Sequence, residues 1–189
     1  METDWAAEVG ADLPSIDVPW EGFVDLRDTP SAMRAIEEAI DHPVLREALL
    51  TLNSTPSPVF TAKCDVWTVG SSAIDPDEFD SLAEDSHDGF ASYIDVLQLD
   101  SGKFASFAFH ELWVRDLTRH LQDLNLSKGR VEFVIRPSIV DARAGYGITL
   151  YAAGCGADAS SAYKAWQNVL RAAVIATMDS VVLPPLAGE

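Results

Sequence analysis

The chain has 189 residues, of which 48% are hydrophobic and 23% charged, as is typical of a single globular domain. Its 30 acidic and 13 basic residues give a formal net charge of −17. Such a surface repels phosphate backbones and anionic lipids, so nucleic-acid and membrane binding are disfavoured. No apolar run approaches the length of a membrane span, the N-terminus lacks the apolar core of a secretory signal, and two cysteines are too few for a disulfide framework. We therefore expect a cytoplasmic protein.

The net negative charge lies entirely in the first half of the chain. Residues 1–100 contain 22 acids and four bases, whereas residues 101–189 contain eight acids and nine bases. This distribution suits a protein partner with a basic surface. The alternative is that the acids serve solubility or adaptation to salt, since net charge acts on solubility before it acts on fold or function.

The first elements in chain order are an arm and two helices. Residues 1–28 combine prolines and scattered acids without a sustained hydrophobic period, which predicts an irregular N-terminal arm. Thr29 and Pro30 make a favourable helix start, with a capping hydroxyl followed by proline in the first turn. Pro43 interrupts this helix and begins a second, shorter one, because proline cannot donate to the preceding turn.

Beyond Pro58 the hydrophobic period changes from helical spacing to two, which predicts half-buried strands. The predicted strands cover residues 59–69, 90–99, 104–109, 130–140 and 146–153. Residues 70–89, between the first two, hold seven acids and no lysine or arginine, so we expect a long acidic loop there.

A helix is predicted for the stretch AFHELWVRDLTRH and the residues that follow it, to about residue 125. Trp113, Leu117 and Leu121 recur at helical spacing and form its apolar stripe. Asn125 and Gly129 mark the end of this helix.

The same helix opens with His110 and Glu111, like the zinc-protease sequence His-Glu-x-x-His. The position of the second histidine is occupied by Val114, however. His120 lies about 15 Å farther along the helix axis than His110, so one ion cannot bind both side chains. No metal site and no cofactor are predicted.

The charged residues of this helix have a plainer explanation. Glu111 and Arg115, and likewise Asp116 and His120, are four residues apart and of opposite charge, which favours ion pairs on the helix surface. Arg115 and Arg119 also make a basic spot on an otherwise acidic protein. This spot is suited to binding a carboxylate or an acidic loop of a partner.

A long final helix begins near Asp158 or Ser160 and completes the predicted order α-βββ-α-ββ-α. The fold class is then α+β: two layers, with a mostly antiparallel sheet of about five strands and helices packed on one face. Residues 29–180 form this single domain, and residues 181–189 form a C-terminal tail. The order of elements over residues 30–178 is similar to that of type III secretion chaperones and related small chaperone-like domains, which are acidic dimers; no sequence motif carries this likeness.

Cys155 is the best single position for a nucleophile, since it stands between two glycines shortly before a helix. A catalytic thiol also needs a base within hydrogen-bonding reach, and no histidine is near in the sequence. We therefore predict no catalytic residue, and Cys155 remains a weak candidate.

Four acids of the predicted loop, Asp75, Asp77, Glu78 and Asp80, are the principal candidates for partner binding. Their spacing resembles a calcium loop, but Phe79 occupies a ligand position and the turning glycine is absent, so no metal site is predicted. Because the loop is exposed and strongly charged, we expect it to attract a basic partner.

Two hypotheses about function follow. The first is an acidic protein-binding module without catalytic activity, of the chaperone, adaptor or inhibitor kind. Trp67, Tyr93, Val134 and Tyr151 are expected on the open face of the sheet, which would serve as an interface for a partner or for a homodimer. The alternative is a small-molecule-binding protein or thiol enzyme built around Cys155 and the Arg115/Arg119 helix.

Overall fold

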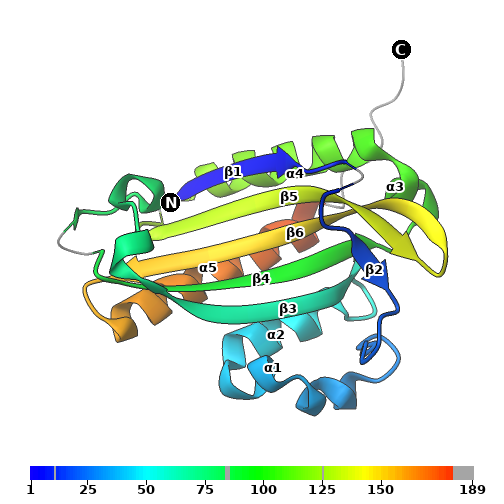
Figure 1. Cartoon of the computed structure of the whole chain (residues 1–189), viewed down its shortest axis with the longest axis horizontal. Helices are drawn as coiled ribbons and strands as arrows, with labels where there is room; N and C mark the ends of the chain where they lie inside the picture. The colour runs from blue at the N-terminus through cyan, green and yellow to red at the C-terminus, as the bar shows by residue number, and fades with distance from the viewer. Residues whose placement is uncertain (11, 84–85, 125, 181–189) are drawn as a thin grey trace.

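The computed structural model describes residues 1–10, 12–83, 86–124 and 126–180. At its centre is a six-stranded sheet with the order β1-β5-β6-β4-β3, and β2 also pairs with β5 (Figure 1). The strands are β1 (Glu2–Ala7), β2 (Ile16–Val18), β3 (Val59–Gly70), β4 (Asp88–Gln98), β5 (Gly129–Val140) and β6 (Arg143–Gly156). Strands β3, β4, β6 and β5 pair antiparallel, whereas β1 and β2 pair parallel with β5, so the sheet is mixed but mostly antiparallel.

The helices lie mainly on one face of this sheet. They are α1 (Glu37–Asp41), α2 (Pro43–Leu52), α3 (Ser101–Ala105), α4 (Phe107–Gln122) and α5 (Ala159–Ser180), with short 3-10 turns η1 (Pro30–Ala35), η2 (Ser71–Ala73) and η3 (Pro76–Phe79). Figure 1 shows α4 and α5 behind the sheet and α2 beside β3. Side chains from α2, α4, α5 and the strands form one continuous apolar core. The predicted fold class, α+β with helices against a mostly antiparallel sheet, is confirmed.

The predicted core is also confirmed, with one exception. The buried members are Phe60, Ile94, Leu117, Leu121, Phe133, Ile135, Ile148, Leu150, Trp166 and Leu170. Val66 is only half-buried, because it lies in the last part of β3, the edge strand of the sheet. Helical spacing in α4 and α5 and alternation in β4, β5 and β6 therefore identified the inward faces. In β3 a bulge between Thr61 and Cys64 interrupts the alternation, so Phe60 is buried against β2 and not on the same face as Val66.

The first 28 residues are less irregular than predicted, because they include β1 and β2. Strand β1 pairs with β5 from Glu2 opposite Arg130 to Ala7 opposite Ile135, and β2 pairs with the far end of β5. Both pairings are parallel, so the partner strand lies far downstream in the sequence and no local pattern indicates it. The division into an arm and a single domain stays a prediction.

The strand predicted for residues 104–109 is wrong, since this segment belongs to α3 and α4. The Asp100 carboxylate accepts a hydrogen bond from the backbone N–H of Lys103 at 2.8 Å, and the Ser106 hydroxyl accepts one from that of Phe109 at 3.1 Å. Each is an N-cap that begins a helix. Two strands, β3 and β4, therefore lie between α2 and α4 in place of the expected three, and the element order on which the likeness to type III secretion chaperones depended is not the one observed.

The predicted tail, residues 181–189, lies outside the described residues. Within the described ranges, no helix is both long and apolar enough to cross a bilayer.

Candidate functional site

The face of the sheet opposite α4 and α5, here called the open face, carries a line of aromatic and acidic side chains. The strand register pairs Asp65 with Tyr93, Tyr93 with Tyr151, Tyr151 with Glu132, and Glu132 with Asp4. Directly paired residues on adjacent strands point to the same face, so these five side chains cross the sheet as one line, the tyrosine row. It has two tyrosines at its centre and carboxylates at both ends.

The rings on this face contact one another. The ring centroids of Tyr93 and Tyr151 lie 6.0 Å apart, and those of Trp67 and Tyr93 lie 6.4 Å apart. Burial, followed by the carboxylates of Asp95 and Asp65, raises the pKa of Tyr93 to about 12. The phenol therefore remains protonated at neutral pH, and the same carboxylates make its surroundings favourable for a cation.

A hollow lies next to the tyrosine row. The register aligns Trp67, Ala91, Ala153 and Arg130 as the adjacent line across the open face. Since alanine side chains are short, they leave a low floor between the larger neighbours, and the hollow has a volume of about 220 Å³. Its lining includes Trp67, Glu78, Phe79, Ala91, Arg130, Glu132, Tyr151 and Ala153. We call it the alanine hollow.

Among the described residues that line the alanine hollow, Arg130 is the single base, and it faces two acids. Its Nη1 forms an ion pair with Oε2 of Glu78, and its Nη2 lies 3.5 Å from Oε2 of Glu132. The Arg130 side chain is 30% exposed and that of Glu78 is 54% exposed, so solvent reaches this cluster. Two carboxylates against one guanidinium leave the hollow with a net negative charge.

A buried polar chain lies beside the tyrosine row. Arg136 donates from Nε to Oγ1 of Thr149 at 3.0 Å, and the Thr149 hydroxyl donates to Oδ1 of Asp95 at 2.6 Å. The Arg136 guanidinium also lies 2.7 Å from Oε2 of Glu8 and donates to the Tyr151 hydroxyl at 3.4 Å. Burial raises the pKa of Asp95, although the Thr149 hydrogen bond and Arg136 oppose that shift. The contact from Arg136 links this chain to the Tyr151 hydroxyl.

Two covers leave only the middle of the open face accessible. At one end, Ile16 and Val18 of the arm pack on Phe60 and Leu97. At the other end, Ile74 and Phe79 of the segment after β3 pack on Val69, Ala153 and Cys155. Figure 1 shows the two covers at opposite ends of the strands. The tyrosine row and the alanine hollow lie between them.

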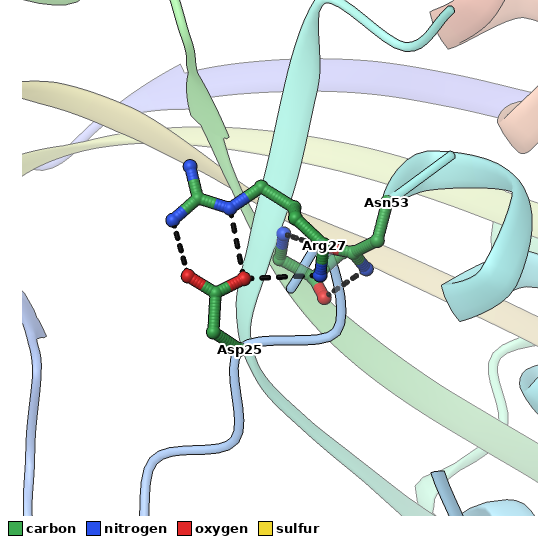
Figure 2. Close-up of polar contacts among 4 residues, drawn as sticks. Asp25, Arg27 and Asn53 are labelled. Atoms are coloured by element: carbon green, nitrogen blue, oxygen red, sulfur yellow. Dashed lines mark hydrogen bonds and ion pairs between the residues drawn. The ribbon is translucent and has the colours of Figure 1, made fainter. Parts of the chain in front are cut away.

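The arm is held in place at the free edge of β3 (Figure 2). Two nitrogens of the Arg27 guanidinium donate to the Asp25 carboxylate, and that guanidinium lies 4.0 Å from the centroid of the Phe60 ring. Asn53, at the end of α2, donates to the Thr61 hydroxyl at 2.7 Å and accepts from the Thr61 backbone N–H at 3.1 Å. The Arg27 guanidinium holds the arm against the Phe60 ring, and the Asn53 amide occupies a backbone N–H at the edge of β3.

A second cavity, of about 370 Å³, lies beneath the arm at this edge. It opens where β3 has a bulge between Thr61 and Cys64. The Trp20 indole N–H donates to the carbonyl oxygen of Ala62 at 3.3 Å and closes one side. The lining includes Trp20, Ile36, Leu49, Lys63 and Tyr93. Because Tyr93 belongs to both, the cavity borders the tyrosine row.

The four acids predicted to bind a partner are exposed but are not free on a mobile loop. Asp75 accepts from the backbone N–H of Asp77 at 3.1 Å and caps η3, while Glu78 reaches Arg130. Asp80 lies 3.0 Å from the amino group of Met1. Their role in binding stays a prediction, and the structure adds that the segment carrying them is folded over the sheet.

Cys155 is fully buried beneath that segment. Its side chain is enclosed by Ile74 and Phe79, and its Sγ lies 3.7 Å from the Ser86 hydroxyl. A nucleophile must contact its substrate, and in this arrangement the thiol of Cys155 is closed off from solvent.

The predicted basic spot on α4 is partly neutralised by its own helix. Arg115 pairs with Glu111 at 2.7 Å, as predicted. Arg119 pairs with Asp116 at 2.9 Å, so the expected pair between Asp116 and His120 is wrong. Asp116 pairs with Arg119, three residues farther along the helix, and not with His120, four residues farther along.

His110 belongs to the core. It is 0% exposed, and its Nδ1 lies 2.9 Å from the carbonyl oxygen of Ser106. Burial lowers its pKa, so the neutral form is favoured. Among the described residues, no group of three or more His, Cys, Asp or Glu side chains is arranged to hold a metal ion.

The sequence predicted part of this site. Alternation placed Trp67, Tyr93 and Tyr151 on the open face, and the register confirms that they share it. The alignment of Asp65 and Glu132 with the tyrosines was missed, because it depends on strand register, although alternation within β3 and β5 already put both acids on the outward side. The hollow was missed because its floor is two alanines, which carry no chemical signal.

No protein-family model, no curated protein and no solved structure matches the chain. The geometry of the open face is therefore the basis for an interpretation of function.

Proposed function

We propose that this protein is a binding module without catalytic activity, and that the middle of its open face binds a basic, extended segment of another protein. The observation that carries the proposal is the tyrosine row, in which two contacting rings are flanked by Asp65 on one side and by Glu132 and Asp4 on the other. Aromatic faces and carboxylates both attract cationic side chains. Their combination favours lysine or arginine on the partner.

The distribution of charge supports the same partner. The chain has a net charge of −17, and the acids around the open face belong mostly to its acidic first half. A negative field steers a basic partner toward the face over a distance set by salt. A homodimer through this face would bring two tyrosine rows together, and their carboxylates would repel each other, so we favour a different protein as the occupant.

The test is binding of a fluorescently labelled octalysine peptide, followed by anisotropy. Neutralising the row with Asp65→Asn and Glu132→Gln should weaken binding by about fivefold, since each lost ion pair at a surface contributes a modest amount. The matched control is Glu111→Gln with Asp116→Asn, which removes the same charge from α4 on the other face. If control and row variants weaken binding equally, or if the wild type does not bind the peptide, the proposal is wrong.

A kinetic test addresses the four acids on the segment after β3 that covers one end of the open face. Replacing Asp75, Asp77, Glu78 and Asp80 with Asn or Gln should slow association of the peptide more than it speeds dissociation, because charges at the rim of an interface act mainly on encounter. The wild-type association rate should also fall as salt is added. Stopped-flow measurements at two ionic strengths decide this, and a rate indifferent to salt contradicts steering.

A thiol enzyme around Cys155 receives no support from these contacts, since the thiol is buried and the two arginines of α4 are each paired with an acid.

A further inference from the structure

The alanine hollow points to the kind of basic residue that the partner supplies. We propose that it binds an arginine side chain of the partner, and that Arg130 occupies the same two carboxylates while the partner is absent. This inference rests on the proposed function, because the arginine belongs to the segment that crosses the open face. It adds a specific pocket and a preference of arginine over lysine.

The first support is the shape of the hollow. Ala91 and Ala153 form its floor, and the walls are Trp67 and Tyr151 together with Phe79 of the cover. A planar guanidinium can lie against an aromatic ring and still direct its N–H groups sideways to carboxylates. An ammonium has no plane to stack and makes no paired contact with a carboxylate, so the same walls suit lysine less well.

The second support is that no basic side chain of the described residues lies over the Trp67 or Tyr151 ring. Elsewhere the protein places its own bases over its aromatic rings: Arg27 over Phe60, Lys63 over Trp20, Lys103 over Phe109 and Arg115 over Trp5. In the described part of the chain no such contact involves Trp67 or Tyr151, although Trp67 is 39% exposed. These two faces are therefore available to a cation from outside.

The third support is the position of Arg130. It rises from β5 at the side of the hollow and reaches Glu78 and Glu132, which shows that both carboxylates can accept a guanidinium in this space. The distance of 3.5 Å to Glu132 is long for a charge-assisted hydrogen bond. Because exposed ion pairs are weak, a partner arginine that also gains the aromatic contacts can displace Arg130 from Glu132.

The experiment compares two labelled peptides, octaarginine and octalysine, and follows their ratio of affinities. On the wild type we expect the arginine peptide to bind about fivefold more tightly, the size of a cation–π contact with one or two rings. Trp67→Ala and Glu132→Gln should each bring this ratio close to one. Arg130→Gln should increase the ratio, because the internal competitor is gone.

The matched control for Arg130→Gln is Arg143→Gln, which removes the same charge from the exposed start of β6. Both variants should bind basic peptides more tightly, because each makes the net charge of the protein more negative. Only Arg130→Gln should change the ratio of the two peptide affinities. If the two peptides bind the wild type equally and Trp67→Ala changes nothing, the inference fails while the proposed function stands. If Arg130→Gln lowers the ratio, Arg130 does not compete and the inference is wrong. If neither peptide binds, both proposals fail.

Discussion

The two faces of the sheet differ in burial and in side-chain chemistry, and two neighbouring residues of β6 show this difference. Leu150 is 1% exposed and packs beneath the helices with Phe133 and Ile94. Tyr151, the next residue, is half-buried on the open face and contacts Tyr93. Most of the helix face is buried beneath α2, α4 and α5, with half-buried side chains such as Val66 near the edge, whereas the open face is covered only at its two ends.

The difference shows what each face can tolerate. Beneath α4 and α5 the strand side chains are almost all apolar, because an unpaired polar group buried there would be costly. On the open face, Asp95 and Arg136 are buried as well, but Thr149 joins them by hydrogen bonds to both. The helix face therefore supplies stability, and the open face can retain polar and aromatic groups for binding.

The largest expected effect tests this contrast directly. Leu150→Ala should lower the free energy of unfolding by about 2–5 kcal/mol, since a cavity remains among well-packed neighbours. Tyr151→Ala, one residue away, should cost about 1 kcal/mol, as is usual for a half-exposed site. Urea denaturation of both variants measures the difference. Equal losses would mean that the open face stabilises the fold as much as the helix face does.

A smaller effect concerns the polar chain that crosses the open face. Arg136→Met should cost about 1.5–3 kcal/mol, because the hydrogen bonds of the guanidinium are lost and the Asp95 carboxylate loses a nearby positive charge. Arg143→Met, on the exposed start of the same hairpin, is the control and should leave the urea midpoint almost unchanged. A midpoint for Arg136→Met equal to that of the control would show that the chain contributes nothing to stability.

The contrast between the faces also separates what the sequence could predict from what it could not. Period-two alternation in β5 put Phe133 on the helix face, since facing along a strand is a local property. In β3 it put Phe60 on the same face as Val66, whereas the bulge between Thr61 and Cys64 shifts the register and Phe60 packs under the arm on the open face. The tyrosine row joins five strands, so it depends on register between segments that are distant in the chain. The strand predicted for residues 104–109 is wrong because their aromatic content favours a strand only weakly, whereas the two N-caps at Asp100 and Ser106 begin helices there.

The pH dependence of stability tests the buried acid of the open face. Burial raises the pKa of Asp95 above its ordinary value of 3.8, so the folded protein binds this proton more tightly than the unfolded chain does. The resulting stabilisation is complete below the unfolded pKa and is lost as pH rises through the folded pKa. Asp95→Asn removes this term and keeps an oxygen that accepts from Thr149.

We therefore expect the stability of Asp95→Asn, relative to wild type, to increase from about pH 4 to the folded pKa and to remain constant above it. Urea denaturation at a series of pH values measures this difference. Asp123→Asn, at an exposed position after α4, is the control and should follow the wild-type curve. A difference that is flat across the whole range, or that falls with rising pH, contradicts a raised pKa at Asp95.

The smallest expected effect is on the surface of α4, away from both faces of the sheet. Glu111→Gln removes an exposed i,i+4 pair with Arg115 and should cost only about 0.2–0.5 kcal/mol. The loss should shrink further as salt is added, because the pair is screened by ions. Thermal unfolding at low and high salt measures this loss, with Asp116→Asn as a test of a second exposed pair on the same helix.

A loss above about 1 kcal/mol that persists in high salt would exceed what an exposed pair contributes. It would mean that Arg115, which lies 5.3 Å over the Trp5 ring, depends on Glu111 to hold β1 against α4. The helix face would then owe part of its stability to charged groups, and its contrast with the open face would be one of degree.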